Sequence, residues 1–275
     1  MSTCYRRAGG RGVLWFWIGL VSCAHRPLDT AIESPVQHYT VEVHAEIGPL
    51  LTDGESLTDQ TSTELELSLN LSVQDVRMFR DGSMGKRVLF TDAELKQDGQ
   101  VTEGLMLQGR AVELRTFLNG EILAIGWVDR IAGANRFMDV FEVVFPAISP
   151  APPSVRPQQA VKRRIIWPFL TDDGLRWDAA VDAVWSNQGA EERQERKAWR
   201  LSYEGPWRIH GGRRGHQAVI RYLASGSAKG TAWFDKRTGD LIGHNFQWGR
   251  TVTIKGAAGE VSQVQDFRGT VEWIR

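Results

Sequence analysis

The stretch TELELSLNLSV, residues 63–73, decides the fold class of this chain. Every second residue from Leu65 to Val73 is apolar, and the residues between them are glutamate, serine or asparagine. Successive side chains of a β-strand point to opposite faces of its sheet. The period of two therefore predicts a long antiparallel strand with one buried face and one face in water.

The same alternation continues on both sides of this stretch. It is clear in YTVEVHAEI at residues 39–47, and Asp-Gly or Asn-Gly turns at 81–82, 98–99 and 119–120 separate such runs. No long stretch has helical apolar spacing, and residues 188–198 predict a short polar helix or a charged loop. The sequence therefore predicts a mainly β fold of curved antiparallel sheet with few or no long helices.

A proline-rich segment divides the strand signals into two groups. FPAISPAPPSVRP, residues 145–157, carries five prolines and predicts a linker over residues 147–163. The expected division is a first β half at 39–146 and a second, tryptophan-rich β half at 164–275.

The two halves share a spacing that suggests an internal duplication. It consists of a glycine, an alanine two residues later and a phenylalanine six residues after that: Gly109, Ala111 and Phe117 in the first half, Gly226, Ala228 and Phe234 in the second. Two interpretations stay open. One is a duplication that gives two half-barrels, and the other is chance similarity between hairpins.

The N-terminal segment, residues 1–22, has the features of a secretory signal. Three arginines precede an apolar run from Val13 to Val21, and no acidic residue occurs before residue 23. As a helix this run would span roughly 14 Å. A membrane core of about 30 Å needs about 20 residues, so the run is too short for a transmembrane helix.

The stretch LVSC, from Leu20 to Cys23, resembles the lipobox of bacterial lipoproteins. The resemblance implies cleavage before Cys23, acyl chains on Cys23 as the contact with a membrane, and a tether over residues 23–38. Ala24 in place of an aspartate implies the bacterial outer membrane, with the protein facing the periplasm or the cell surface. The alternative is an ordinary signal peptide in which Cys23 is incidental.

Composition and motifs exclude several classes of function. The chain has 33 basic and 33 acidic residues, which argues against a nucleic-acid partner. Its only other cysteine, Cys4, lies in the signal segment, so a mature chain would have no internal disulfide. The six histidines lack zinc-site spacing and no P-loop is present. The Ser83-x-x-Lys86 pattern predicts a hairpin turn. We therefore expect a non-enzyme without cofactor or metal.

Tryptophan is concentrated beyond the predicted linker, where eight of the eleven lie. Core packing is one interpretation. The other is a concave aromatic face that binds an apolar ligand, with a candidate pocket formed by Phe117, Trp127, Trp233, Phe234 and Trp248.

In architecture, this layout resembles the Lol-type half-barrel carriers and uncharacterised duplicated β-rich envelope lipoproteins. The resemblance implies a non-enzymatic binding module for an apolar or lipid-like ligand. Two alternatives stay open: a structural or adaptor subunit that binds an envelope protein, and a hydrolase with dispersed active-site residues.

Overall fold

The structure is a computed structural model, and its secondary structure is mainly β. It describes residues 30–32, 34–52, 55–56, 61–102, 107–117, 121–128, 138–150, 157, 159–170, 176–214, 219–257 and 259–274. The predicted signal segment and Cys23 lie outside these residues. Among the described residues, no helix combines the length and the apolar character needed to cross a membrane.

The strands belong to one sheet. In the first half they are β1 (Thr30–Ala31), β2 (Gln37–Ile47), β3 (Leu51–Thr52), β4 (Glu55–Ser56), β5 (Thr63–Met78), β6 (Met84–Gln97), β7 (Gln100–Val101), β8 (Ala111–Thr116) and β9 (Ile122–Trp127). After the helix α1 (Met138–Ile148) come β10 (Ala160–Leu170), β11 (Arg176–Arg193), β12 (Arg196–Arg214), β13 (Val219–Asp235), β14 (Leu241–Gly256) and β15 (Gly259–Ile274).

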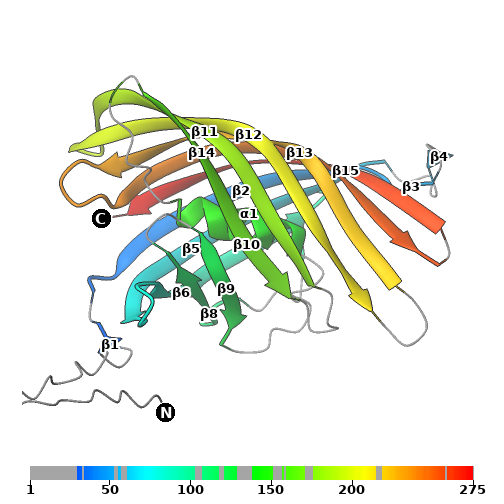
Figure 1. The fold of residues 1–275 in the computed structure, drawn as a ribbon, viewed down its shortest axis with the longest axis horizontal. Helices are drawn as coiled ribbons and strands as arrows, with labels where there is room; N and C mark the ends of the chain where they lie inside the picture. The colour runs from blue at the N-terminus through cyan, green and yellow to red at the C-terminus, as the bar shows by residue number, and fades with distance from the viewer. Residues whose placement is uncertain are drawn as a thin grey trace, which may run out of the picture.

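Eleven of these strands form a continuous path in the order β10-β11-β12-β13-β14-β15-β2-β5-β6-β8-β9. Neighbours along the path are antiparallel, and the sheet curves into a nearly closed barrel (Figure 1). The prediction of a mainly β, curved antiparallel sheet is confirmed. The two predicted halves join through the ladder between β15 and β2, in which Val271 lies opposite Val41.

The path ends at β9 and β10, which lie against each other without a hydrogen-bonded ladder in the described part of the chain. Since eleven strands alternate in direction, the first and the last run the same way. Two parallel neighbours need a long crossover between them, usually a helix. Here that crossover contains α1, and the sheet curves around it (Figure 1). We call the boundary between β9 and β10 the seam.

The inner face of the sheet carries the core. Leu67, Leu69 and Leu71 are at most 2% exposed, while the intervening Ser68 is exposed. The alternation predicted from residues 63–73 is therefore confirmed. Core side chains of both halves and of α1 form one continuous cluster.

The helix α1 was not predicted, and its burial explains why. Val143, Val144, Phe145 and Ala147 are completely buried although they point in different directions around the helix. A helix with protein on all sides is apolar all round and lacks the one-sided period of a surface helix. Part of the predicted linker belongs to regular structure, since residues 147–148 end α1 and residues 160–163 begin β10.

The prediction of a helix or loop at residues 188–198 is wrong. These residues form the ends of β11 and β12 and the tight turn between them. The turn residues Gln194 and Glu195 have φ angles of 49° and 60°. Such a turn usually carries Asn-Gly, so its sequence gave no hairpin signal.

Candidate functional site

The candidate site is the interior of the sheet, where α1 contacts strands β2, β14 and β15. Most of its wall is apolar, and two sets of polar contacts join the helix to β14. One involves the side chain of Glu142 in α1, and the other involves the backbone carbonyl of Ala147.

Glu142 forms an ion pair with Arg250 of β14. The Arg250 guanidinium donates to Glu142 Oε2 at 2.8 Å, and neither side chain is exposed to solvent. Arg250 Nε also donates to Gln265 Oε1 at 2.8 Å, and the guanidinium lies 4.4 Å from the ring centre of Trp207. Two desolvated charges are therefore held by each other, by an amide and by an aromatic face.

A second set of contacts runs through His244. Its Nδ1 lies 3.0 Å from the Ala147 carbonyl, and its Nε2 lies 3.0 Å from the Tyr203 hydroxyl. Trp248 Nε1 donates to the same hydroxyl at 2.9 Å. These contacts assign the proton to Nδ1: His244 donates to Ala147 and accepts from Tyr203, which in turn accepts from Trp248.

Burial sets the protonation of this set. It lowers the pKa of His244 to about 4, although the bond to the Ala147 carbonyl acts in the opposite direction. Burial also raises the pKa of Tyr203. Both side chains are therefore neutral near pH 7. The last carbonyls of a helix lack partners within it, and neutral His244 supplies a donor to one of them.

Aromatic rings pack around these polar groups. Trp248 lies 5.2 Å from Trp207 and 5.7 Å from Trp167, and Trp185 stacks on Tyr203 at 4.5 Å, all measured between ring centres. The aromatic face is thus a packed core around α1 in this structure. Among the described residues, the buried indole N–H groups of Trp167, Trp185 and Trp207 have no acceptor.

The structure brings three of the five candidate pocket residues to the inner side. Phe234 and Trp248 belong to the core cluster, and Trp127 stacks on Phe90 at 5.9 Å and meets Phe145 of α1 edge-on at 6.3 Å. Phe117 is half-buried at one end of the sheet.

Trp233 does not join them. It forms a separate cluster with Ala198 and Ile242, and the Arg193 guanidinium lies 3.8 Å from its ring centre. Trp233 precedes Phe234 in β13, and consecutive strand residues point to opposite faces. The candidate pocket as predicted is therefore corrected: Trp233 lies on the outer face.

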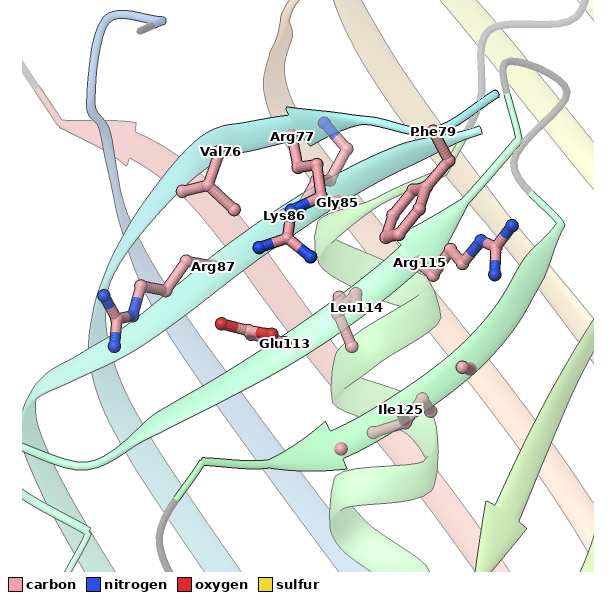
Figure 2. Close-up of a pocket in the computed structure, with 12 residues that line it drawn as sticks. Val76, Arg77, Phe79, Gly85, Lys86, Arg87, Glu113, Leu114, Arg115 and Ile125 are labelled. Carbon is pink, nitrogen blue, oxygen red and sulfur yellow. The ribbon is translucent and has the colours of Figure 1, made fainter. Parts of the chain in front are cut away.

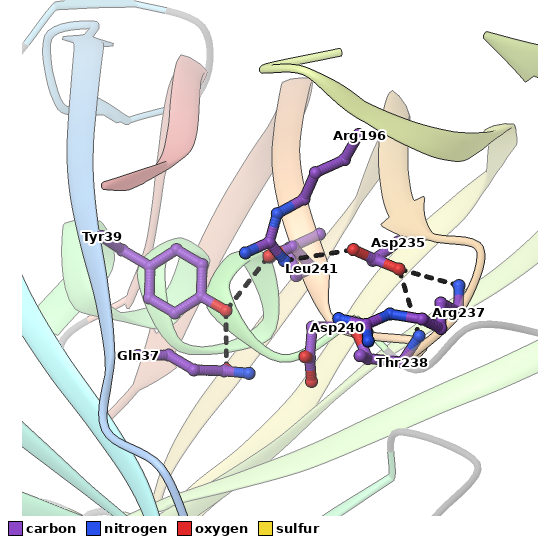
Figure 3. A network of polar contacts seen from close by, with 8 residues as sticks. All are labelled: Gln37, Tyr39, Arg196, Asp235, Arg237, Thr238, Asp240 and Leu241. Carbon is purple, nitrogen blue, oxygen red and sulfur yellow. Dashed lines mark hydrogen bonds and ion pairs between the residues drawn. The ribbon is translucent and has the colours of Figure 1, made fainter. Parts of the chain in front are cut away.

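A cavity of about 250 Å³ lies where α1 ends, and we call it the mouth cavity. Its wall includes Tyr39, Lys86, Phe117, Ile148 and Leu241. The Lys86 ammonium pairs with Asp75 at 2.7 Å. The Tyr39 hydroxyl has two acceptors within reach of its single proton, Gln37 Oε1 at 2.8 Å and the Leu241 carbonyl oxygen at 3.2 Å (Figure 3). The mouth cavity is thus polar at its rim and apolar next to α1.

The turn between β13 and β14 forms one wall of the mouth cavity. Asp235 accepts from the backbone N–H groups of Arg237 at 2.7 Å and Thr238 at 3.1 Å, and from the Arg196 guanidinium at 3.1 Å (Figure 3). Burial alone would raise the pKa of Asp235, but these donors lower it. The ionised carboxylate therefore holds the turn.

No catalytic constellation is seen where the sequence motifs would place one. Ser83 Oγ donates to Asp81 at 2.6 Å and accepts from Arg115, while Lys86 pairs with Asp75. Ser83 and Lys86 thus have different partners, as the hairpin-turn interpretation predicts. Across the described residues, no group of three or more His, Cys, Asp and Glu side chains could hold a metal ion.

Sequence reasoning missed the polar contacts of α1, although a signal for them exists. His244, Phe246, Trp248, Arg250 and Val252 alternate along β14 and are all buried. A histidine and an arginine on an otherwise apolar strand face point to buried polar partners, because a buried charge needs one. The matching acid, Glu142, interrupts the apolar run VFEVVF.

Comparison with known proteins adds no relative: no family model matches the sequence, and no curated protein matches it either.

Proposed function

We propose that this protein is a non-enzymatic, lipid-anchored binding module of the bacterial outer membrane. In this proposal an apolar, acyl-type ligand occupies the interior of the sheet in place of α1. The observation that carries it is the way α1 is held: an apolar helix fills the interior, yet it is fixed by a fully buried ion pair.

A buried ion pair is a poor way to gain stability. The cost of removing two charges from water often cancels their attraction, and apolar replacements are frequently as stable or more so. The pair does fix one position for α1, and its charges regain water if the helix leaves. Glu142 and Arg250 therefore support a helix that docks in one register and is also released.

The seam supports the same proposal. β9 and β10 are the two strands that flank the α1 crossover, and no ladder joins them among the described residues. Movement of α1 past this boundary breaks no ladder hydrogen bond. At any other boundary between neighbouring strands of the path, the same movement would have to break ladder hydrogen bonds.

The chemistry of the wall suggests the ligand. Large aromatic rings favour an apolar chain, and three buried indole N–H groups, on Trp167, Trp185 and Trp207, are donors without an acceptor in the described structure. Ester or amide carbonyls accept such donors. We infer an acyl ester or acyl amide as the ligand class.

The test follows ligand uptake and the helix together. Purified protein is titrated with dansyl-undecanoic acid, and backbone hydrogen exchange is measured by mass spectrometry with and without the probe. We expect one probe per chain and faster exchange in residues 138–148, with β12 to β14 unchanged. No uptake, or uptake with α1 still protected, would overturn the proposal.

The anchor is tested separately. Mass spectrometry of the N-terminal peptide from the envelope-expressed protein should show Cys23 as the first residue with acyl chains attached. The Cys23→Ser variant should leave the membrane fraction. An unmodified Cys23 within the purified protein would remove the anchor from the proposal and leave the interior site untouched.

A further inference from the structure

A groove of about 450 Å³ lies on the outer face of the sheet, across β5, β6, β8 and β9. Its floor is low because small residues alternate with long ones. One row of residues that lie opposite each other across the four strands is Arg77, Gly85, Arg115 and Ala124. In the next row, Gly126 lies opposite Glu113. We call it the outer groove.

Arginines surround this groove (Figure 2). The Arg115 guanidinium lies 4.1 Å from the ring centre of Phe79, and that of Arg77 lies 5.9 Å from it. Arg115 also pairs with Asp81 at 2.7 Å. Two guanidinium groups therefore lie near the ring of Phe79, in contacts of the cation–π type.

Among the described residues, no ion pair involves Arg77 or Arg87, whereas their neighbours Lys86 and Arg115 pair with Asp75 and Asp81. On the second half of the sheet, carboxylates pair with Arg164, Arg176, Arg193, Arg196, Arg200 and Arg208. Because the whole chain has no net formal charge, attraction of an anion to the groove has to come from these local cations.

The positions of Arg77 and Arg87 allow both to reach one anion. Arg77 lies opposite Gly85 in the ladder, and Arg87 is two residues further along on the same face. Such diagonal neighbours are about 7–8 Å apart at the backbone, within reach of long side chains. Guanidinium groups bind phosphate oxygens in pairs of parallel hydrogen bonds.

One carboxylate completes the pattern. Glu113 lies directly opposite Arg87 in the ladder and is exposed in the same groove (Figure 2). Its negative charge repels a ligand that carries only negative charge. It can instead pair with a cationic group that is attached close to a phosphate. A two-carbon chain is short enough to connect neighbouring ladder positions.

We propose that the outer groove binds a phosphoethanolamine group, with Arg77 and Arg87 on the phosphate and Glu113 on the ammonium. The ligand is either free phosphoethanolamine or the headgroup of a phospholipid. The site is independent of the proposed function, because it lies on the outer face and needs no acyl chain.

The test is calorimetric titration of the full chain with phosphoethanolamine and with glycerol 3-phosphate. We expect one phosphoethanolamine per chain. Arg77→Gln/Arg87→Gln should weaken it by about tenfold or more, the usual value of a charge-assisted contact. The matched control, Arg164→Gln/Arg208→Gln, removes the same charge elsewhere and should bind as the wild type does.

The role of Glu113 has its own readout. Glu113→Gln should weaken phosphoethanolamine but leave glycerol 3-phosphate binding equal or tighter. Equal binding of the two ligands by the wild type would overturn the assignment of the ammonium. No binding at millimolar concentrations, or equal binding by the Arg77→Gln/Arg87→Gln variant, would overturn the site.

Flotation with vesicles identifies the source of the ligand. Wild type and Arg77→Gln/Arg87→Gln are compared on phosphatidylethanolamine and phosphatidylcholine vesicles, so that any contribution of the N-terminal segment cancels. A phosphatidylethanolamine preference that the variant lacks assigns the lipid headgroup. Binding of soluble phosphoethanolamine without such a preference assigns the free molecule.

Discussion

Arg250 shows how one charged side chain can fix a helix inside an apolar sheet. It has a carboxylate, an amide oxygen and two aromatic faces around it and no access to water. Removing its partner would leave a buried charge without compensation, whereas removing both charges would leave an apolar contact. The two changes should therefore act in opposite directions.

We predict that Arg250→Met destabilises the protein by about 3–5 kcal/mol, because Glu142 is then buried alone. Glu142→Met/Arg250→Met should be as stable as the wild type or more stable by about 1–4 kcal/mol. Urea unfolding measures both. If the ion pair permits release of α1, the double variant should also take up less dansyl-undecanoic acid. Higher uptake by a more stable double variant would contradict this.

His244 makes stability depend on pH. Its pKa is about 4 in the folded protein and 6.5 in an unfolded chain, so the unfolded state binds a proton first as the pH falls. The contribution is full above pH 6.5 and is lost as the pH falls toward 4, by about 3 kcal/mol in total.

His244→Gln keeps a donor and an acceptor but does not titrate. Between pH 6.5 and 4 the wild type should lose about 3 kcal/mol more than this variant, measured by urea unfolding at each pH. His210→Gln, at an exposed position, is the control and should follow the wild type. Parallel curves for wild type and His244→Gln would mean that His244 is not buried as described.

At the scale of elements, close packing of strands explains several glycines. A Cβ at Gly226 in β13 would lie 1.9 Å from the Gly249 carbonyl oxygen and 2.6 Å from Arg250 Cα. A Cβ at Gly126 in β9 would have nothing within 4 Å. The two strand glycines therefore differ in the room that a side chain would have beside them.

Gly226→Ala should destabilise the protein by roughly 1–3 kcal/mol, the usual cost of overpacking. Gly126→Ala should be neutral or stabilising by a few tenths of a kcal/mol, because alanine restricts the unfolded chain. Thermal unfolding followed by circular dichroism measures both variants. Equal melting temperatures would show that β13 and β14 adjust their spacing easily.

The individual strands were predictable from the sequence, because alternation such as that in residues 63–73 is a local signal. The helix α1 was not, since burial on all sides removes its period. The hairpin at residues 188–198 was missed because Gln194 and Glu195 hold positive φ angles usually held by Asn-Gly. Trp248 lies on the inner face and Trp233 on the outer face, a difference that a tryptophan count could not predict because it does not say which face a strand position occupies.

At the scale of the whole molecule, the two predicted halves share one sheet and one core cluster. Which strands pair across the chain could not be predicted, because the ladder between β2 and β15 joins segments far apart in sequence. A shared core should unfold as one cooperative unit.

We predict a single unfolding transition in urea, with coincident curves from far-ultraviolet circular dichroism and tryptophan fluorescence. Eight of the eleven tryptophans lie beyond residue 163, so the fluorescence reports mainly the second half, while circular dichroism reports all strands. Two separated midpoints would show that the halves unfold independently.

The pairing of Val41 with Val271 has a consequence for how the chain is made. β2 is synthesised long before β15, so the sheet is not continuous until β15 is available, and contacts across such a separation form slowly. Until then β2 keeps an unpaired edge, which is prone to wrong pairing. The continuous sheet therefore forms only after β15 has been synthesised.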